Sequence, residues 1–108
     1  MKKVLLDENL PVKFKYRLQD ACEVYTVTDK GWNALENGEL ITAMQKDNFD
    51  FLLTSDKNLQ YQQNLAKYTM GFIVLSVPDN NYETILPLVE KIKEVITAEP
   101  VKKLVIID

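Results

Sequence analysis

Four acidic residues stand beside short apolar segments of this chain, and their positions could bring them into one site. Asp7 and Glu8 come directly after the apolar run "VLL", and Asp56 comes two residues after the run "FDFLLT". Glu39 lies in "NGELI", where a helical pattern begins. Carboxylate oxygens are the ligands that Mg²⁺ and Mn²⁺ favour in proteins. These residue types therefore indicate chemistry carried by carboxylates, with a divalent cation as the cofactor.

Other common catalytic groups are absent from the sequence. The chain has no histidine, which excludes an imidazole base, a Ser-His pair and a histidine-ligated zinc. A single cysteine, Cys22, excludes a cysteine zinc cluster and an internal disulfide. None of the three glycines forms a phosphate-binding GxxxxGK or GxGxxG turn.

The bulk composition is that of one globular domain spanning residues 1–108. Apolar residues make up 46% of the chain, enough for a core, and no apolar run approaches the roughly 20 residues of a membrane helix. The single cysteine fits a reducing compartment, so we expect a cytoplasmic protein without a membrane partner. The net charge of −3 disfavours a polyanionic substrate only weakly, because cations bound to the four acids would nearly balance it.

The hydrophobic pattern alternates between strands and helices. Strands are expected at 3–6, 23–27, 49–54, 71–77 and 103–107. Helices are expected at 13–20, at 38–47 with Asn37 as the cap, at 58–67, and from about 84 to 97 with a start near Thr84 or a kink at Pro87. This order predicts an α/β fold of three layers, with a mostly parallel five-stranded sheet flanked by helices.

The carboxyl ends of parallel strands lie along one edge of a sheet, and ligands bind outside that edge where the strand order reverses. Asp7, Glu8 and Asp56 follow strands at this edge, and Glu39 lies in a helix turn that starts there. If the first and third strands are neighbours, their acids repel each other unless a proton or a cation lies between them. Asp7, Glu39 and Asp56 are therefore candidate catalytic residues, and these three with Glu8 are candidate metal ligands.

Ordinary helix capping explains each acid taken singly. Asp7, Glu8 or Asn9 could cap the helix that begins near Pro11, and Asp56 could cap the helix at 58–67. Glu39 also complements the dipole of its own helix. Asn9, Lys57, Asn58 and Tyr61, which lie near these acids, are candidates for substrate binding. The alternative for Tyr61 is a solvated helix face, and the alternative for Lys57 is an ordinary surface lysine.

The segments "LLDENLP", "NGELI" and "LLTSDKNLQYQQNL", in that order, resemble the small stand-alone branch of the PIN-like domains, over roughly residues 4 to 97. The resemblance implies a Mg²⁺- or Mn²⁺-dependent nuclease that cleaves RNA, often as the toxin half of a toxin–antitoxin pair. It matches Asp7 to the first acid, Glu39 to the acid carried by a helix, and Asp56 to the acid after the "LLT" strand. An antitoxin protein and a second copy of the chain are the protein partners that it implies. A fourth acid of larger relatives has no counterpart, Asn58 being the nearest polar residue.

Two other functions fit parts of the sequence. A phosphoacceptor receiver domain would use Asp7 with Glu8, then Asp56, then Ser76, but it requires a lysine at the end of the fifth strand. Here Lys102 and Lys103 come before that strand. A catalytically weak module that binds a partner is the other alternative, and the apolar strand "KLVII" could pair across an exposed edge.

Overall fold

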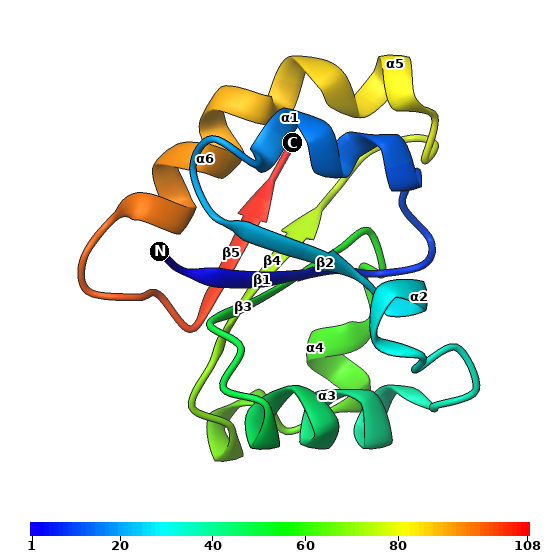
Figure 1. The fold of residues 1–108 in the computed structure, drawn as a ribbon, viewed down its shortest axis with the longest axis vertical. Helices are drawn as coiled ribbons and strands as arrows, with labels where there is room; N and C mark the ends of the chain where they lie inside the picture. Colours follow the sequence, from blue (N-terminus) through cyan, green and yellow to red (C-terminus); the bar gives the residue numbers. More distant parts are fainter.

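The computed structural model describes residues 1–108, which form a single parallel sheet covered by helices on both faces (Figure 1). The strand order is β2-β1-β3-β4-β5. The strands are β1 (Lys3–Leu6), β2 (Glu23–Thr26), β3 (Phe51–Thr54), β4 (Gly71–Leu75) and β5 (Leu104–Ile107). The α-helices are α1 (Lys15–Leu18), α2 (Val27–Lys30), α3 (Asn37–Lys46), α4 (Leu59–Gln62), α5 (Tyr82–Ile85) and α6 (Val89–Thr97). Three 3₁₀ turns, η1 (Val12–Phe14), η2 (Leu65–Lys67) and η3 (Leu86–Leu88), extend these helices or connect them.

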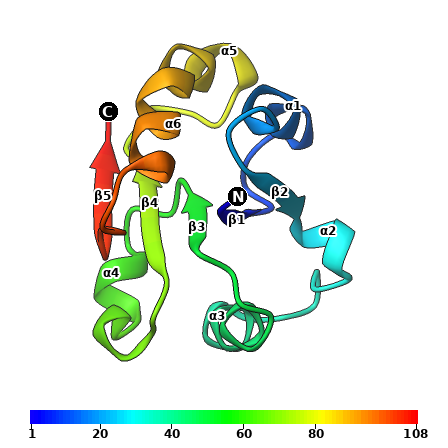
Figure 2. The ribbon, with the colours of Figure 1, turned by 60° about the vertical axis from the view of Figure 1, so that its left-hand side comes forward.

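Two apolar clusters fill the space on either side of the sheet, so the fold has the three layers that the sequence predicts. Successive residues of β1 alternate between them: Val4 and Leu6 belong to one cluster, and Leu5 belongs to the other. The first cluster packs under α1, α5 and α6, and the second packs under α3 and α4 (Figure 2). Each strand is thus held by side chains on both faces, as buried parallel strands require.

All five predicted strands are confirmed, but several helix boundaries differ from the prediction. The second strand ends at Thr26 rather than residue 27, because the Thr26 hydroxyl accepts a hydrogen bond from the Asp29 amide (3.0 Å) and opens α2. The helix expected at 13–20 is divided into η1 and α1, and the helix expected at 58–67 is divided into α4 and η2. The prediction of Asn37 as a cap is wrong: Glu36 is the cap, and Asn37 is the first helical residue.

The last helical stretch bends at its proline. It begins at Tyr82 as α5, passes through η3, which contains Pro87, and continues as α6. Pro87 lacks a backbone N–H and cannot make the regular helical hydrogen bond, so the tighter turn at this point follows from the residue. Ile85, Ile92 and Ile96 still face the core, as their helical spacing predicts.

The strand order reverses between β1 and β3. From β1 the chain moves outward to β2, and from β2 it crosses back to β3 on the other side of β1. β1 and β3 are hydrogen-bonded neighbours, with Leu6 opposite Leu53. The crevice at their carboxyl ends is therefore the topological switch point, the place where ligands bind in open α/β sheets.

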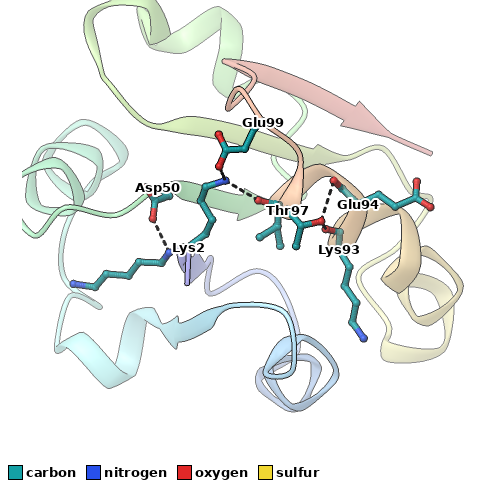
Figure 3. Close-up of polar contacts among 8 residues, drawn as sticks. Lys2, Asp50, Lys93, Glu94, Thr97 and Glu99 are labelled. Atoms are coloured by element: carbon teal, nitrogen blue, oxygen red, sulfur yellow. Dashed lines mark hydrogen bonds and ion pairs between the residues drawn. The ribbon is translucent and has the colours of Figure 1, made fainter.

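The opposite edge of the sheet is joined by polar contacts with paired charges (Figure 3). The Lys2 ammonium group donates to the carbonyl oxygen of Ile96 at the end of α6 (3.1 Å) and pairs with the Glu99 carboxylate (2.8 Å). The Lys3 amide donates to the Asp50 carboxylate (2.7 Å). These contacts attach the start of β1 to α6 and to the segment before β3.

No helix of the structure has both the length and the apolar character needed to cross a bilayer.

Cys22 should be chemically inert in the folded protein. Its side chain is 2% exposed, and burial raises the pKa of the thiol from 9.0 to about 11. We expect no labelling of the native protein by a thiol reagent at pH 8 and full labelling after unfolding. Because the folded state disfavours the thiolate, wild type should also lose stability relative to Cys22→Ala as the pH rises from 9 towards 11. Rapid labelling of the native protein at pH 8 would contradict this prediction.

Candidate acidic site at the carboxyl edge of the sheet

Asp7 and Asp56 meet at the hydroxyl group of Thr54, the last residue of β3. Thr54 Oγ1 donates to Asp7 Oδ2 (2.7 Å) and accepts a hydrogen bond from the Asp56 amide (3.0 Å). The Asp7 amide donates to the Leu53 carbonyl oxygen (2.9 Å), which continues the β1–β3 ladder by one residue and fixes the position of Asp7. The structure thus brings together two of the acids that the sequence predicts for the site.

The environment of Asp7 disfavours its charged form. Burial raises the pKa of this carboxyl above its usual value, and the nearby negative charges of Glu8 and Asp56 raise it further. Hydrogen bonds from the Thr54 hydroxyl and the Glu8 amide lower the pKa and offset part of this shift. A half-buried carboxylate next to other acids is stabilised most effectively by a cation.

No lysine or arginine supplies that positive charge. The six ion pairs of the structure involve other acids: Asp20, Asp29, Asp47, Glu90 and Glu99. Asp7, Glu8 and Asp56 form no ion pair. The acids at the switch point are therefore held by neutral donors only, in contrast to the paired charges at the opposite edge.

Three amide side chains contact Thr54, Glu8 or Asp56 at this edge, and the sequence analysis identified only Asn9 as a binding residue. Asn9 Nδ2 donates to Thr54 Oγ1 (3.3 Å), while Asn9 Oδ1 is buried and has no hydrogen-bond partner. Asn37 Nδ2 lies 3.5 Å from Asp56 Oδ2. Asn33 Nδ2 donates to Glu8 Oε2 (3.3 Å). The signal for Asn33 and Asn37 was their position in the loop and first helical turn after β2, which also lie at this edge.

Glu39 lies in the first turn of α3, as predicted, but its carboxylate has a different partner. Glu39 Oε1 accepts a hydrogen bond from the Glu36 amide (3.0 Å), so it caps the start of its own helix. The structure contains no group of three or more acidic or cysteine side chains arranged to hold a metal ion. From α3 it is Asn37, rather than Glu39, that contacts Asp56. A ligand role for Glu39 stays a prediction.

The predicted substrate-binding residues after β3 lie on the surface beside the site. Lys57 and Asn58 are exposed, and the Asn58 amide donates to Asp56 Oδ1 (3.0 Å). Tyr61 is 79% exposed. A polar depression of about 580 Å³ separates the loop before α3 from α4, and Asn33, Asn37 and Gln63 contribute to its lining. These residues form a surface that a polar ligand can reach.

A smaller cavity of about 210 Å³ reaches Asp7 itself. It lies between the loop after β1 and the start of α2 and is lined by Asp7, Glu8, Leu10 and Thr26 among others. Its lining is about half apolar. Glu8 borders this cavity and, through its hydrogen bond to Asn33, connects it with the polar depression.

The capping interpretation of these acids holds only in part. The cap of η1 is Pro11, which has no side-chain cap hydrogen bond, so none of Asp7, Glu8 and Asn9 caps that turn. Asp56 accepts from the Asn58 amide at the start of α4, which is a local turn contact of the capping type. Glu39 is a true reciprocal cap. Among the four acids, Asp7 and Glu8 therefore have no helix-capping explanation.

The receiver arrangement is matched at three points and fails at the fourth. The strand order 2-1-3-4-5 is that of flavodoxin-like and receiver domains. Asp7, Asp56 and Ser76 all follow carboxyl ends of strands, but Leu104 pairs with Phe72 near the start of β4. Lys102 and Lys103 therefore lie at the opposite edge of the sheet, where they cannot contact a phosphorylated Asp56.

The side chains at the switch point fit a hard divalent cation. The atoms that could coordinate a metal here are all oxygens. One of them, Asn9 Oδ1, is buried and has no hydrogen-bond partner. Mg²⁺ in proteins is usually held by one or two carboxylates, with water and substrate oxygens completing its octahedral shell. Asp7 and Asp56 supply the carboxylates for such a site without a third acid.

The fold and the site together define an α/β domain with a carboxylate pair at the switch point of a parallel sheet. No family model, curated protein or solved structure matches the chain. The resemblance of its motifs to PIN-like domains therefore stays a prediction.

Thr54 should position both carboxylates. Its side chain is fully buried, and its hydroxyl contacts Asp7, Asn9 and the Asp56 amide. Thr54→Val keeps the shape and removes the hydroxyl, so we expect a loss of about 1–3 kcal/mol in the free energy of unfolding. Chemical denaturation measures this loss. Thr54→Ser keeps the hydroxyl and is the matched control; an equal loss in both variants would contradict the hydrogen-bonding role.

Proposed function

We propose that this domain is a divalent-cation-dependent nuclease that hydrolyses RNA phosphodiester bonds. The observation that carries the proposal is the pair Asp7 and Asp56, joined by Thr54 at the switch point and matched by no lysine or arginine. The choice of RNA rests on the resemblance of three sequence segments to PIN-like domains. The same resemblance makes a toxin of a toxin–antitoxin pair the proposed biological role.

Asp7 and Asp56 would hold Mg²⁺ or Mn²⁺, and Asn9 Oδ1 would be a further oxygen donor. A divalent cation in such a site polarises the phosphate and lowers the pKa of bound water. Burial of Asp7 strengthens its attraction to a cation, because the low local dielectric screens charges weakly. The Thr54 hydroxyl holds the Asp7 carboxylate and the Asp56 backbone amide, and Asn58 and Asn37 contact the Asp56 carboxylate.

The neutral and basic residues around the pair would bind the RNA. The side-chain amides of Asn33 and Asn37 and the ammonium group of Lys57 can donate hydrogen bonds to phosphate oxygens. Tyr61, which is largely exposed, can stack on an unpaired base. This surface favours a single-stranded substrate, since its depression is shallow and polar.

The proposal is tested by incubating the purified chain with end-labelled single-stranded RNA in Mn²⁺, in Mg²⁺ and in EDTA. We expect cleavage with either cation and none in EDTA. Asp56→Asn should lower the rate by about 100-fold, because the amide cannot supply the second negative charge. Cleavage that persists in EDTA, or that is absent in all three conditions, would contradict the proposal.

Asp20→Asn is the matched control. Asp20 is an exposed acid that pairs with Lys93 between α1 and α6, away from the switch point. This variant removes one surface carboxylate and should cleave RNA at the wild-type rate. Equal rates for wild type, Asp20→Asn and Asp56→Asn would point to a contaminating nuclease or to a different site.

The variant Glu39→Gln tests whether the metal site has two acidic ligands or three. The structure holds Glu39 against the Glu36 amide, and glutamine can accept the same hydrogen bond. We therefore expect Glu39→Gln to retain most of the cleavage rate. A loss as large as that of Asp56→Asn would restore Glu39 as a ligand and would require its carboxylate to leave the helix cap.

A further inference from the structure

The outer edge of β5 is exposed, and neither charge nor proline protects the strand itself. β5 pairs with β4 on one side only and lies at the open side of the sheet (Figure 2). On this strand Leu104 is 36% exposed and Ile106 is 53% exposed. The four residues of β5 include no charge and no proline, the features with which monomeric proteins protect an edge strand.

The backbone of β5 presents hydrogen-bonding groups to this open side. The carbonyl oxygen of Lys103 accepts from Phe72 of β4 (2.9 Å), and that of Ile107 accepts from Ser76, the residue after β4 (2.7 Å). Alternate residues of a strand direct their backbone groups to opposite sides, so Leu104 and Ile106 direct N–H and C=O outward. The two exposed apolar residues are thus also the two that can pair with another strand.

We propose that β5 pairs antiparallel with β5 of a second copy, about a two-fold axis at Val105. In this register Leu104 of each copy lies opposite Ile106 of the other. Both pairs then exchange two backbone hydrogen bonds and cover each other's side chains on the same face of the sheet. Val105 lies opposite itself as a pair without hydrogen bonds.

Charge favours the same register. Lys102 and Asp108 flank the strand and are both exposed, and the axis at Val105 places Lys102 of one copy opposite Asp108 of the other. A register shifted by one residue would place Leu104 and Ile106 of one copy on the opposite face of the joined sheet from Leu104 and Ile106 of the other copy. Moving the axis to Leu104 would oppose Ile106 and Lys102, and moving it to Ile106 would oppose Leu104 and Asp108. The segment is therefore self-complementary in one register.

The contact joins the two sheets into one but is small. Four paired residues on each copy cover less surface than a permanent dimer requires, so we expect a concentration-dependent equilibrium in the micromolar range. Because the strands of the two copies run in opposite directions, the two Asp7–Asp56 sites face opposite ends of the joined sheet. The pairing does not depend on the proposed nuclease activity.

Sedimentation of the whole chain over a range of concentrations tests the proposal. Wild type should shift from monomer to dimer, and Ile106→Lys should remain monomeric at every concentration, because it places charge in the centre of the contact. Val12→Lys changes an equally exposed apolar residue elsewhere (58% exposed) and should behave as wild type. Circular dichroism establishes that all three are folded. A wild type that stays monomeric, or a folded Ile106→Lys that still dimerises, would overturn the proposal.

Cysteine crosslinking tests the register. In a Cys22→Ala background, Val105→Cys should form a disulfide-linked dimer under mild oxidation, because cross-strand Cβ atoms of such a pair are close enough for a disulfide. Ile106→Cys should not, since it lies opposite Leu104. Equal crosslinking of both variants, or crosslinking of Ile106→Cys alone, would overturn the register.

Exchanging the charges of Lys102 and Asp108 gives an independent test of the register. Lys102→Glu and Asp108→Lys should each weaken the dimer several-fold, and the double variant should recover the wild-type affinity. A double variant weaker than both single variants would contradict the pairing of these residues.

Discussion

Asp7→Asn is expected to lower the rate of Mn²⁺-dependent RNA cleavage by about 100-fold or more. Asp7 is half-buried at the switch point, and burial is the largest cause of its raised pKa. The folded protein retains this unfavourable carboxylate without a lysine or arginine partner, which is typical of a functional residue. The measurement is the single-turnover rate on labelled RNA at saturating Mn²⁺.

Glu8→Gln is the control for Asp7→Asn. Glu8 is the next residue along the chain, is exposed, and contacts Asn33 rather than Thr54. We expect a loss of less than about tenfold, because Glu8 contacts Asp7 through its backbone amide (2.9 Å), which the substitution keeps. Far-UV circular dichroism should show that both variants are folded. Equal losses at Asp7 and Glu8 would contradict the central place of Asp7.

Phe51→Ala is expected to lower the free energy of unfolding by about 3–5 kcal/mol. Phe51 is fully buried on β3 and belongs to the cluster under α1 and α6. Its ring also lies directly against β4: a methyl group added at Gly71 would stand 2.7 Å from the ring and 2.5 Å from the Lys102 carbonyl oxygen. Alanine would leave a cavity between two strands of the sheet.

The loss is a large part of the 5–15 kcal/mol by which domains of this size are stable. Phe51→Leu fills most of the volume and should cost clearly less than alanine does. Urea denaturation monitored by circular dichroism gives both values. A loss below about 1 kcal/mol for Phe51→Ala would show that Phe51 does not support the packing of β3 and β4.

The sheet could be predicted from the sequence because its strands are short, apolar and separated by helical patterns. "VLL", "FLL" and "GFIVL" are buried on both faces, which only a parallel sheet covered by two helical layers explains. The adjacency of β1 and β3 was a condition in the sequence argument, and the structure confirms it. Asp7 and Asp56 were predicted correctly to lie at one edge for this reason.

Helix ends were harder to predict because several polar residues compete to cap each one. Asn37 is a better intrinsic cap than glutamate, yet Glu36 takes this position and pairs reciprocally with Glu39. That pairing directs the Glu39 carboxylate to the backbone, which spacing alone does not reveal. Thr54 was overlooked as the central donor, although a hydroxyl at the end of an apolar strand was a signal for it.

The edge of β5 shows what pattern reasoning can and cannot give. The apolar segment "KLVII" indicated an edge that could pair, and the structure places it at the open side of the sheet. The self-complementary register depends on which backbone groups face outward and on the exposure of Leu104 and Ile106. Those facts require coordinates.

Calorimetric titration of the chain with Mn²⁺ tests the central claim most directly, because it measures cation binding without RNA or a trace nuclease. Wild type and Asp20→Asn should bind Mn²⁺ with the same affinity, and Asp7→Asn and Asp56→Asn should each lose most of the binding. Equal binding by all four proteins, or binding by none, would contradict a metal site formed by Asp7 and Asp56.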